Sequence, residues 1–135
     1  MKVPFVSFLP MEKELDSALR AAFERVYTRS WYIDGEEDKA FEKAFAEYCG
    51  TKFCVGVGNG LDALVMILKA LDIGEGDEVI IPSNTYIATS LAVTYVGAKP
   101  VFVDPDINTF NIDPSLIEAA VTSKTKAIMP VHLYG

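Results

Sequence analysis

Apolar residues recur at helical spacing in two stretches before residue 50. Across residues 11–26 they gather on one side of a helix, with charged residues on the other. Residues 36–48 repeat this pattern, and Gly50 follows as a typical helix terminator. The spacing predicts two amphipathic helices, separated by a loop over residues 28–35 that is rich in aromatic and turn residues.

The pattern changes over residues 53–68. Residues 53–57 are apolar or β-branched apart from one glycine, which predicts a short strand buried on both faces. The turn Gly58-Asn59-Gly60 follows, and apolar residues then return to helical spacing. We therefore predict a strand, a tight turn, and a helix capped by Asn59 or by Asp62.

Short apolar runs alternate with helical patterns in the rest of the chain. Strands are predicted at residues 78–81, 101–103 and 126–132. The segment 82–85 is expected to stop the first of these strands and cap a helix ending near residue 96, and Asp113-Pro114 begins a helix that ends near residue 121. The alternation predicts an α/β fold, a mostly parallel sheet with flanking helices.

Composition narrows the class of partner. The 135 residues are 50% hydrophobic by count, enough for one modest domain with a core. The net charge of −7 argues against nucleic acid and anionic membrane surfaces as partners. No apolar run is long enough to span a bilayer and the N-terminus lacks a signal-peptide core, so we expect a cytoplasmic protein. Cys49, Cys54 and the single His132 do not form a zinc-binding pattern, and reduced, partly buried thiols are expected.

The turn at residues 58–60 is a candidate anion site. The first amides of a helix have no intrahelical partner, and the positive end of the helix dipole lies there. Small residues let a phosphate group approach such a backbone. The alternative is a tight connection without a ligand. No Gly-Lys-Ser/Thr follows, so the turn is not a Walker loop, and Leu61 replaces the third glycine of the dinucleotide fingerprint, which disfavours NAD.

Three aromatic residues are candidate ligand contacts. Tyr86 follows the strand at 78–81, where its ring could stack on a planar cofactor held by the preceding turn, or could pack against its own helix and sheet. Trp31 and Tyr32 could form a substrate wall or an interface anchor, or could close a small core. The pattern alone leaves these alternatives open.

Short motifs in a fixed order carry a family resemblance. They lie at residues 3–5, 30–35, 45–50, 58–64, 74–80, 85–89, 97–104, 111–114 and 127–135, and include Asn-Gly-Leu-Asp-Ala-Leu and a final His-Leu-Tyr-Gly. Each motif is weak alone. Their order and spacing over essentially the whole chain resemble the sugar aminotransferases of the DegT/DnrJ/EryC1/StrS family, which are fold-type I enzymes that use pyridoxal 5'-phosphate (PLP).

The resemblance implies roles for the candidate residues. The amides of Gly60 and Leu61 would hold the cofactor phosphate, with Asn59 beside them, and Tyr86 would stack on the pyridine ring. Many family members have Ser-Gly-Thr at the positions of Asn59-Gly60-Leu61, so a threonine hydroxyl contact is missing here. Because a carboxylate beside a phosphate is unfavourable, Asp62 is expected to point away or to cap the helix.

The resemblance also implies that parts of the active site lie elsewhere. Residues 1–50 would be a helical segment of the fold-type I large domain, and residues 51–135 its first half, so that the chain ends before the domain is complete. The family's Schiff-base lysine and pyridine-binding aspartate would follow residue 135. The lysines present do not replace that lysine, so no catalytic residue is expected in this chain, which alone should not transaminate.

For the whole protein, the resemblance implies transfer of an amino group, from glutamate, to a nucleotide-linked keto-deoxysugar, at C3 of the sugar. A homodimer is implied, with Trp31, Tyr32 and Pro4-Phe5 on the substrate side. Two other hypotheses about the function stay open. One is a PLP-dependent sugar dehydratase, and the other is a non-catalytic protein that binds PLP or a nucleotide.

Overall fold

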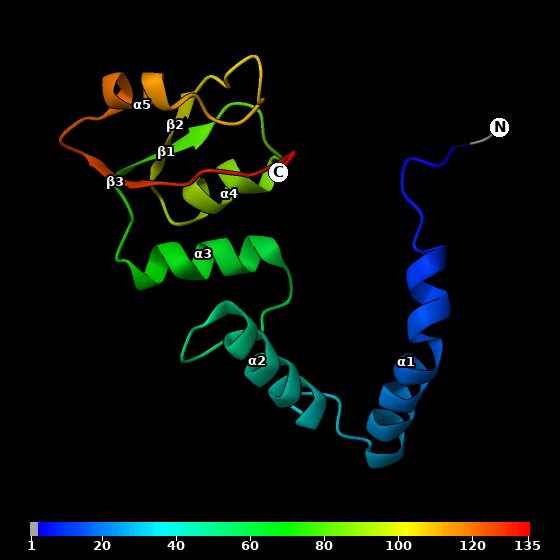
Figure 1. Ribbon diagram of the computed structural model, residues 1–135. Coiled ribbons are helices and arrows are strands. Elements are labelled where there is room, and N and C mark those ends of the chain that lie inside the picture. Colours follow the sequence, from blue (N-terminus) through cyan, green and yellow to red (C-terminus); the bar gives the residue numbers. More distant parts are fainter. Residues whose placement is uncertain (1–2) are drawn as a thin grey trace. The chain divides into compact units, whose positions relative to one another are not determined.

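The computed structural model describes residues 3–135, which form two compact units, one ending at Gly56 and the other beginning at Val57 (Figure 1). The elements in chain order are α1 (Leu9–Arg29), α2 (Glu36–Cys49), α3 (Gly60–Ala70), β1 (Glu78–Pro82), α4 (Ala88–Tyr95), β2 (Lys99–Val103), α5 (Pro114–Ala120) and β3 (Thr125–Ile128). None of the helices in this described part is both long and apolar enough to cross a membrane.

The first unit contains α1 and α2, and both predicted helices are confirmed. α1 begins earlier than predicted because Pro10 lies in its first turn, where a missing N–H removes no hydrogen bond. It ends at Arg29, and its C-cap residue Ser30 has a φ of 52°. The C-cap residue of α2 is Gly50 with a φ of 67°, a conformation that glycine adopts without strain. No residue of α1 is buried, so its apolar side lies exposed.

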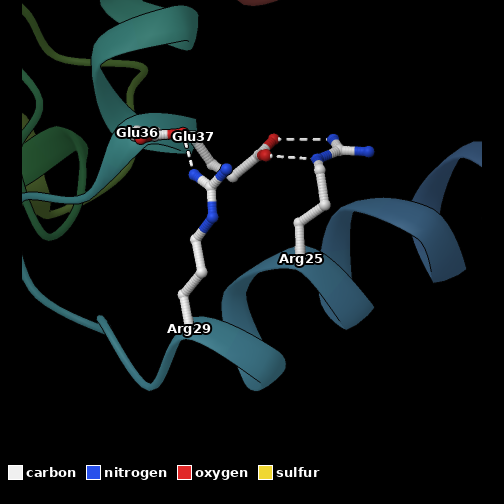
Figure 2. A network of polar contacts seen from close by, with 4 residues as sticks. All are labelled: Arg25, Arg29, Glu36 and Glu37. Carbon is white, nitrogen blue, oxygen red and sulfur yellow. Dashed lines mark hydrogen bonds and ion pairs between the residues drawn. The ribbon is translucent and has the colours of Figure 1, made fainter.

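Two ion pairs join the end of α1 to the first turn of α2 (Figure 2). Arg25 donates from Nε and Nη2 to the two carboxylate oxygens of Glu37, at 2.6 and 3.0 Å, and Arg29 pairs with Glu36. The hydrogen bonds from Arg25 lower the pKa of Glu37 below its ordinary range. All four side chains are exposed, so we expect each pair to contribute little to stability.

Residues 53–57 do not form the predicted strand. Phe53 is 83% exposed and Val55 is 75% exposed. The amide of Gly56 donates to Oε1 of Glu42, at 2.7 Å, and not to another strand. A strand exists only through backbone hydrogen bonds to a neighbour. Within residues 3–135 no strand pairs with this stretch, so its apolar, β-branched composition is not sufficient to make it one.

The second unit is built on a three-stranded parallel sheet in the order β2-β1-β3. β1 lies in the centre and is buried along its whole length. Pro100 lies in β2, which is an edge strand, where the absence of its N–H costs no ladder bond on the open side. The predicted α/β class, with a parallel sheet and flanking helices, is confirmed.

Helices cover both faces of this sheet (Figure 1). α3 and α4 pack on one face, in a cluster formed by Leu68, Ile73, Val79, Ile81, Ala92, Val93 and Ala98. α5 packs on the other, around Ile80, Val103 and Ile112. Alternate residues of β1 therefore point into opposite clusters, as the strand pleat requires. Because both faces are covered, β1 reads as a continuous apolar run rather than an alternating one.

Some predicted boundaries in this unit are wrong. α4 begins at Ala88, and its N-cap residue Ile87 provides no side-chain hydrogen bond, so the segment 82–85 does not cap it. β3 is shorter than predicted and ends at Ile128. The amide of Met129 still donates to the carbonyl oxygen of Ile80, but the next rung of the ladder would need an N–H from Pro82 of β1, which proline lacks. The predicted start of α5 at Asp113-Pro114 is confirmed, and Asp113 is its N-cap residue, whose side chain accepts a hydrogen bond from the amide of Ser115 at 2.8 Å.

A buried carboxylate lies at the amino edge of the sheet. Glu78, the first residue of β1, is 7% exposed and accepts hydrogen bonds from Oγ1 of Thr122, at 2.7 Å, and Nζ of Lys99, at 3.1 Å. The hydrogen bond from Thr122 lowers the pKa of Glu78 most, and the hydrogen bond from Lys99 lowers it further. The carboxylate thus ties β1 to β2 and to the loop that precedes β3.

Glu78→Gln is expected to destabilise the protein in a pH-dependent way. The pKa of the Glu78 carboxyl is lower in the native state than in the unfolded state. The ionised carboxylate therefore stabilises the native state fully above the unfolded pKa of about 4.3, and this stabilisation is lost as the pH falls through the native pKa. Urea and thermal unfolding from pH 7 to pH 3 would measure it. We expect the variant to melt several degrees below wild type at pH 7 and to converge with it at low pH. A difference that does not change with pH would contradict the role of the charge.

Candidate functional site

Asn59 shapes the amino end of α3. Its backbone is extended, with φ of −167° and ψ of 173°, and its side-chain oxygen accepts a hydrogen bond from the amide of Asp62 at 3.0 Å. Its carbonyl oxygen accepts from the amide of Ala63 at 3.2 Å. Of the two predicted caps, Asn59 is therefore the N-cap residue, and it satisfies two of the amides in the first turn.

The other two amides of this turn, those of Gly60 and Leu61, donate to no acceptor within residues 3–135. A side chain added at Gly60 would meet no atom within 4 Å, so the space beside this backbone is open. Two adjacent free N–H groups at the positive end of a helix dipole are suited to an anion such as phosphate. We call these two amides, with the Asn59 cap, the α3 cradle.

Asp62 lies closer to the cradle than expected. Its Oδ2 accepts a hydrogen bond from Nδ2 of Asn59 at 2.9 Å. A Cβ added at Gly58 would lie 3.0 Å from the same oxygen. The carboxylate thus neither points away from the turn nor caps the helix itself. Instead it folds back over Gly58 and holds the side chain that provides the cap.

Tyr86 lies in the loop between β1 and α4 and is 75% exposed. Its ring therefore does not pack into the core, and that alternative is wrong for the described residues. Figure 1 shows that α3 and α4 both begin at the end of the unit toward which β1 points, where ligands of parallel sheets bind. The exposed ring and the α3 cradle thus belong to the same end of the second unit.

Ser83 and Asn84 organise this carboxyl edge, through contacts that the sequence did not predict. Oγ of Ser83 donates to Oδ1 of Asp104 at 3.1 Å, and Nδ2 of Asn84 donates to the carbonyl oxygen of Phe110 at 3.3 Å. These bonds tie the loop after β1 to the loop after β2. The available signal was positional, because Ser83 and Asp104 each follow directly on a strand.

Trp31 and Tyr32 belong to the first unit, where they are 51% and 63% exposed. Nε1 of Trp31 donates to the carbonyl oxygen of Ile33 at 2.7 Å, and the Lys39 ammonium lies 5.5 Å from the centre of the indole ring. Within this unit the pair does not close a core. Cys49 is exposed rather than partly buried, and Cys54 is half-buried.

The lysines near the sheet lie at its amino edge. Lys99 is the first residue of β2, and its ammonium group donates to Glu78. Lys126 is the second residue of β3. Lys69 is in the last turn of α3, at the opposite end of that helix from the cradle. These positions separate the three ammonium groups from the carboxyl edge.

Comparisons with known proteins agree on one family. The model of the DegT/DnrJ/EryC1/StrS aminotransferase family matches residues 13–135. The dTDP-3-amino-3,6-dideoxy-alpha-D-galactopyranose transaminase of Aneurinibacillus thermoaerophilus is 56% identical over 133 residues, which are 98% of this chain and 37% of that protein. The chain thus spans little more than a third of the length of this relative.

Solved structures give the same result. The crystal structure of S. venezuelae DesV in complex with a ketimine intermediate matches with a TM-score of 0.93 and 48% identity, over 99% of this chain and 36% of DesV. NtdA from Bacillus subtilis with bound cofactor PMP (pyridoxamine phosphate) matches with a TM-score of 0.85 and 37% identity, over 100% of this chain and 32% of NtdA.

Proposed function

Because the chain belongs to the DegT/DnrJ/EryC1/StrS aminotransferase family, we propose that the whole protein transfers an amino group to a keto sugar carried on a nucleotide. The observation that carries the proposal is the pair of free amides at Gly60 and Leu61, in a relative of proteins that bind PMP or a ketimine. The name of the 56% identical relative, a dTDP-3-amino-sugar transaminase, supports C3 of a dTDP-linked deoxysugar as the position that is aminated.

The residues of the α3 cradle fit the phosphate of PLP. The amides of Gly60 and Leu61 would donate to it, and Asn59 would fix the turn that presents them. Tyr86, whose ring is exposed, would lie against the pyridine ring. When bound, PLP supplies an electron sink that allows an amino group to leave one substrate and enter another.

The remaining roles belong to the same proposal. Residues 51–135 would form the first half of the cofactor-binding domain, and residues 1–50 a helical segment of it. The lysine and aspartate that complete the cofactor site would lie outside the present sequence. Trp31 and Tyr32, both exposed, would contribute to the substrate side in a cytoplasmic homodimer that takes its amino group from glutamate.

Turnover by the full-length protein tests this proposal. With PLP, glutamate and a dTDP-linked 3-keto-6-deoxyhexose, we expect 2-oxoglutarate and a dTDP-3-amino sugar in equal amounts. Mass spectrometry of the sugar and a coupled assay of 2-oxoglutarate would measure both products. Glu78→Gln is the matched control, because it lies at the opposite edge of the sheet and should retain turnover at a temperature where it is folded.

Three other outcomes would contradict the proposal. Loss of a sugar hydroxyl without incorporation of nitrogen would identify a dehydratase. Binding of PLP without either product would identify a non-catalytic protein. Binding of a free nucleotide without any yellow cofactor would identify a generic nucleotide-binding protein.

A further inference from the structure

We propose that Asp62 is a positioning residue for the cofactor phosphate and acts through Asn59. The inference rests on the proposed function, which provides the phosphate. It goes beyond that function by giving a role to the Asp62 carboxylate, whose charge alone would disfavour it beside a bound phosphate. Its basis is the reciprocal pair in which Asn59 accepts from the Asp62 amide and donates to the Asp62 carboxylate.

Asn59 can turn its amide group in two ways, and only one of them caps α3. With Oδ1 toward the helix, the side chain accepts from the amide of Asp62 at 3.0 Å. With Nδ2 in that place, two donors would face each other. The Asp62 carboxylate accepts from Nδ2 at 2.9 Å, and because an ionised carboxylate only accepts, it selects the capping orientation.

This selection keeps the anion site free. While Oδ1 of Asn59 is held by the amide of Asp62, it does not compete for the amides of Gly60 and Leu61. If Asn59 were released, the same oxygen could bond the cradle amides, and the first turn of α3 would lose its cap. Asp62 would thus keep the two donors pre-organised for the phosphate before it binds.

Gly58 is part of the same arrangement. A Cβ at this position would lie 3.0 Å from Oδ2 of Asp62, which is tighter than nine in ten real Cβ contacts. The carboxylate would have to move by a few tenths of an ångström, and this shift would weaken its hydrogen bond to Asn59. Gly58 is therefore needed for the space that the Asp62 carboxylate occupies, and not for an unusual φ.

The test compares Asp62→Ala with Asp62→Asn in the full-length protein. Both variants remove the charge, but only asparagine keeps an acceptor for Nδ2 of Asn59. The affinities for PMP, followed by its fluorescence, and for inorganic phosphate, followed by competition, would be measured. We expect Asp62→Ala to bind both ligands about 3- to 10-fold more weakly than Asp62→Asn, the value of one side-chain hydrogen bond. Asp62→Asn should bind at least as tightly as wild type.

A double-mutant cycle gives a second measurement if Asp62→Ala is poorly folded alone. Gly58→Ala should weaken PMP binding in wild type by a similar factor and have no further effect in the Asp62→Ala background. Asp113→Ala, which removes the cap of α5, controls for general loss of stability and should leave both affinities unchanged.

The possible failures can be told apart. Equal affinities of Asp62→Ala and Asp62→Asn, or additive effects of Gly58→Ala and Asp62→Ala, would overturn the role of Asp62 while leaving the proposed function intact. If wild type binds neither PMP nor phosphate, the proposed function fails as well.

Discussion

Gly60→Pro is expected to weaken the binding of PMP and of inorganic phosphate by the full-length protein roughly 10- to 100-fold. A hydrogen bond to a charged group contributes about 1.5–3 kcal/mol, and proline removes one such donor from the α3 cradle. The Gly60 amide has no acceptor among residues 3–135, so the substitution costs no hydrogen bond within that part of the chain.

The local backbone accepts proline at this position. Gly60 is the first residue of α3, the helical position that proline prefers. Asn59 before it is extended, with ψ of 173°, as a residue before proline should be. Gly60→Ala is the matched control, since it keeps the N–H and adds a Cβ that has no atom of the described residues within 4 Å. Wild-type affinity in Gly60→Pro, or an equal loss in Gly60→Ala, would contradict the role of this amide.

Tyr86→Ala is expected to weaken PMP binding about 10-fold while leaving inorganic phosphate binding unchanged. Stacking of two rings contributes about 0.5–1.5 kcal/mol beyond the apolar area that it buries, and free phosphate has no ring to lose. Because Tyr86 is 75% exposed, removal of its side chain should not destabilise the fold. Fluorescence titration with PMP and competition with phosphate would measure the two affinities.

Tyr86→Phe is the control for the ring itself and should bind PMP as wild type does. A parallel loss of PMP and phosphate binding in Tyr86→Ala would mean that the residue supports the loop and not the pyridine ring. The two probes therefore separate a residue that contacts the ring from those that hold the phosphate.

Local patterns predicted the elements whose stabilising contacts are local. The end of α2 and the start of α5 were predicted because Gly50, which follows α2, and Asp113, which precedes α5, act within one turn of the helix. β1 was predicted because an apolar run covered on both faces is unbroken in sequence. Asn59 was one of two predicted caps, and the choice between them depended on side-chain orientation, which spacing does not determine.

Elements that depend on a distant partner were predicted less well. The stretch 53–57 has the composition of a strand, but pairing is a property of two segments, and no partner lies within the described residues. α4 begins after its predicted cap because the side chains of Ser83 and Asn84 bond the loop after β2 instead of the helix amides. Each of these two hydrogen bonds joins residues that are more than twenty positions apart in the sequence.

The candidate site, too, has features that local rules predicted and features that depend on side-chain contacts, which they did not predict. Its free amides follow from local rules, because any helix start leaves such groups unless a side chain or ligand takes them. The fold of Asp62 over Gly58 did not follow, since charge alone predicted that the carboxylate would turn away. Two hydrogen bonds with Asn59 hold it beside the cradle despite that charge.

A crystal structure of the full-length protein with PMP tests the central claim most directly. We expect phosphate oxygens within about 3.2 Å of the amide nitrogens of both Gly60 and Leu61, with the pyridine ring against the Tyr86 phenol. A phosphate bound at another helix or loop, with the two amides closed off by the protein's own side chains, would contradict it.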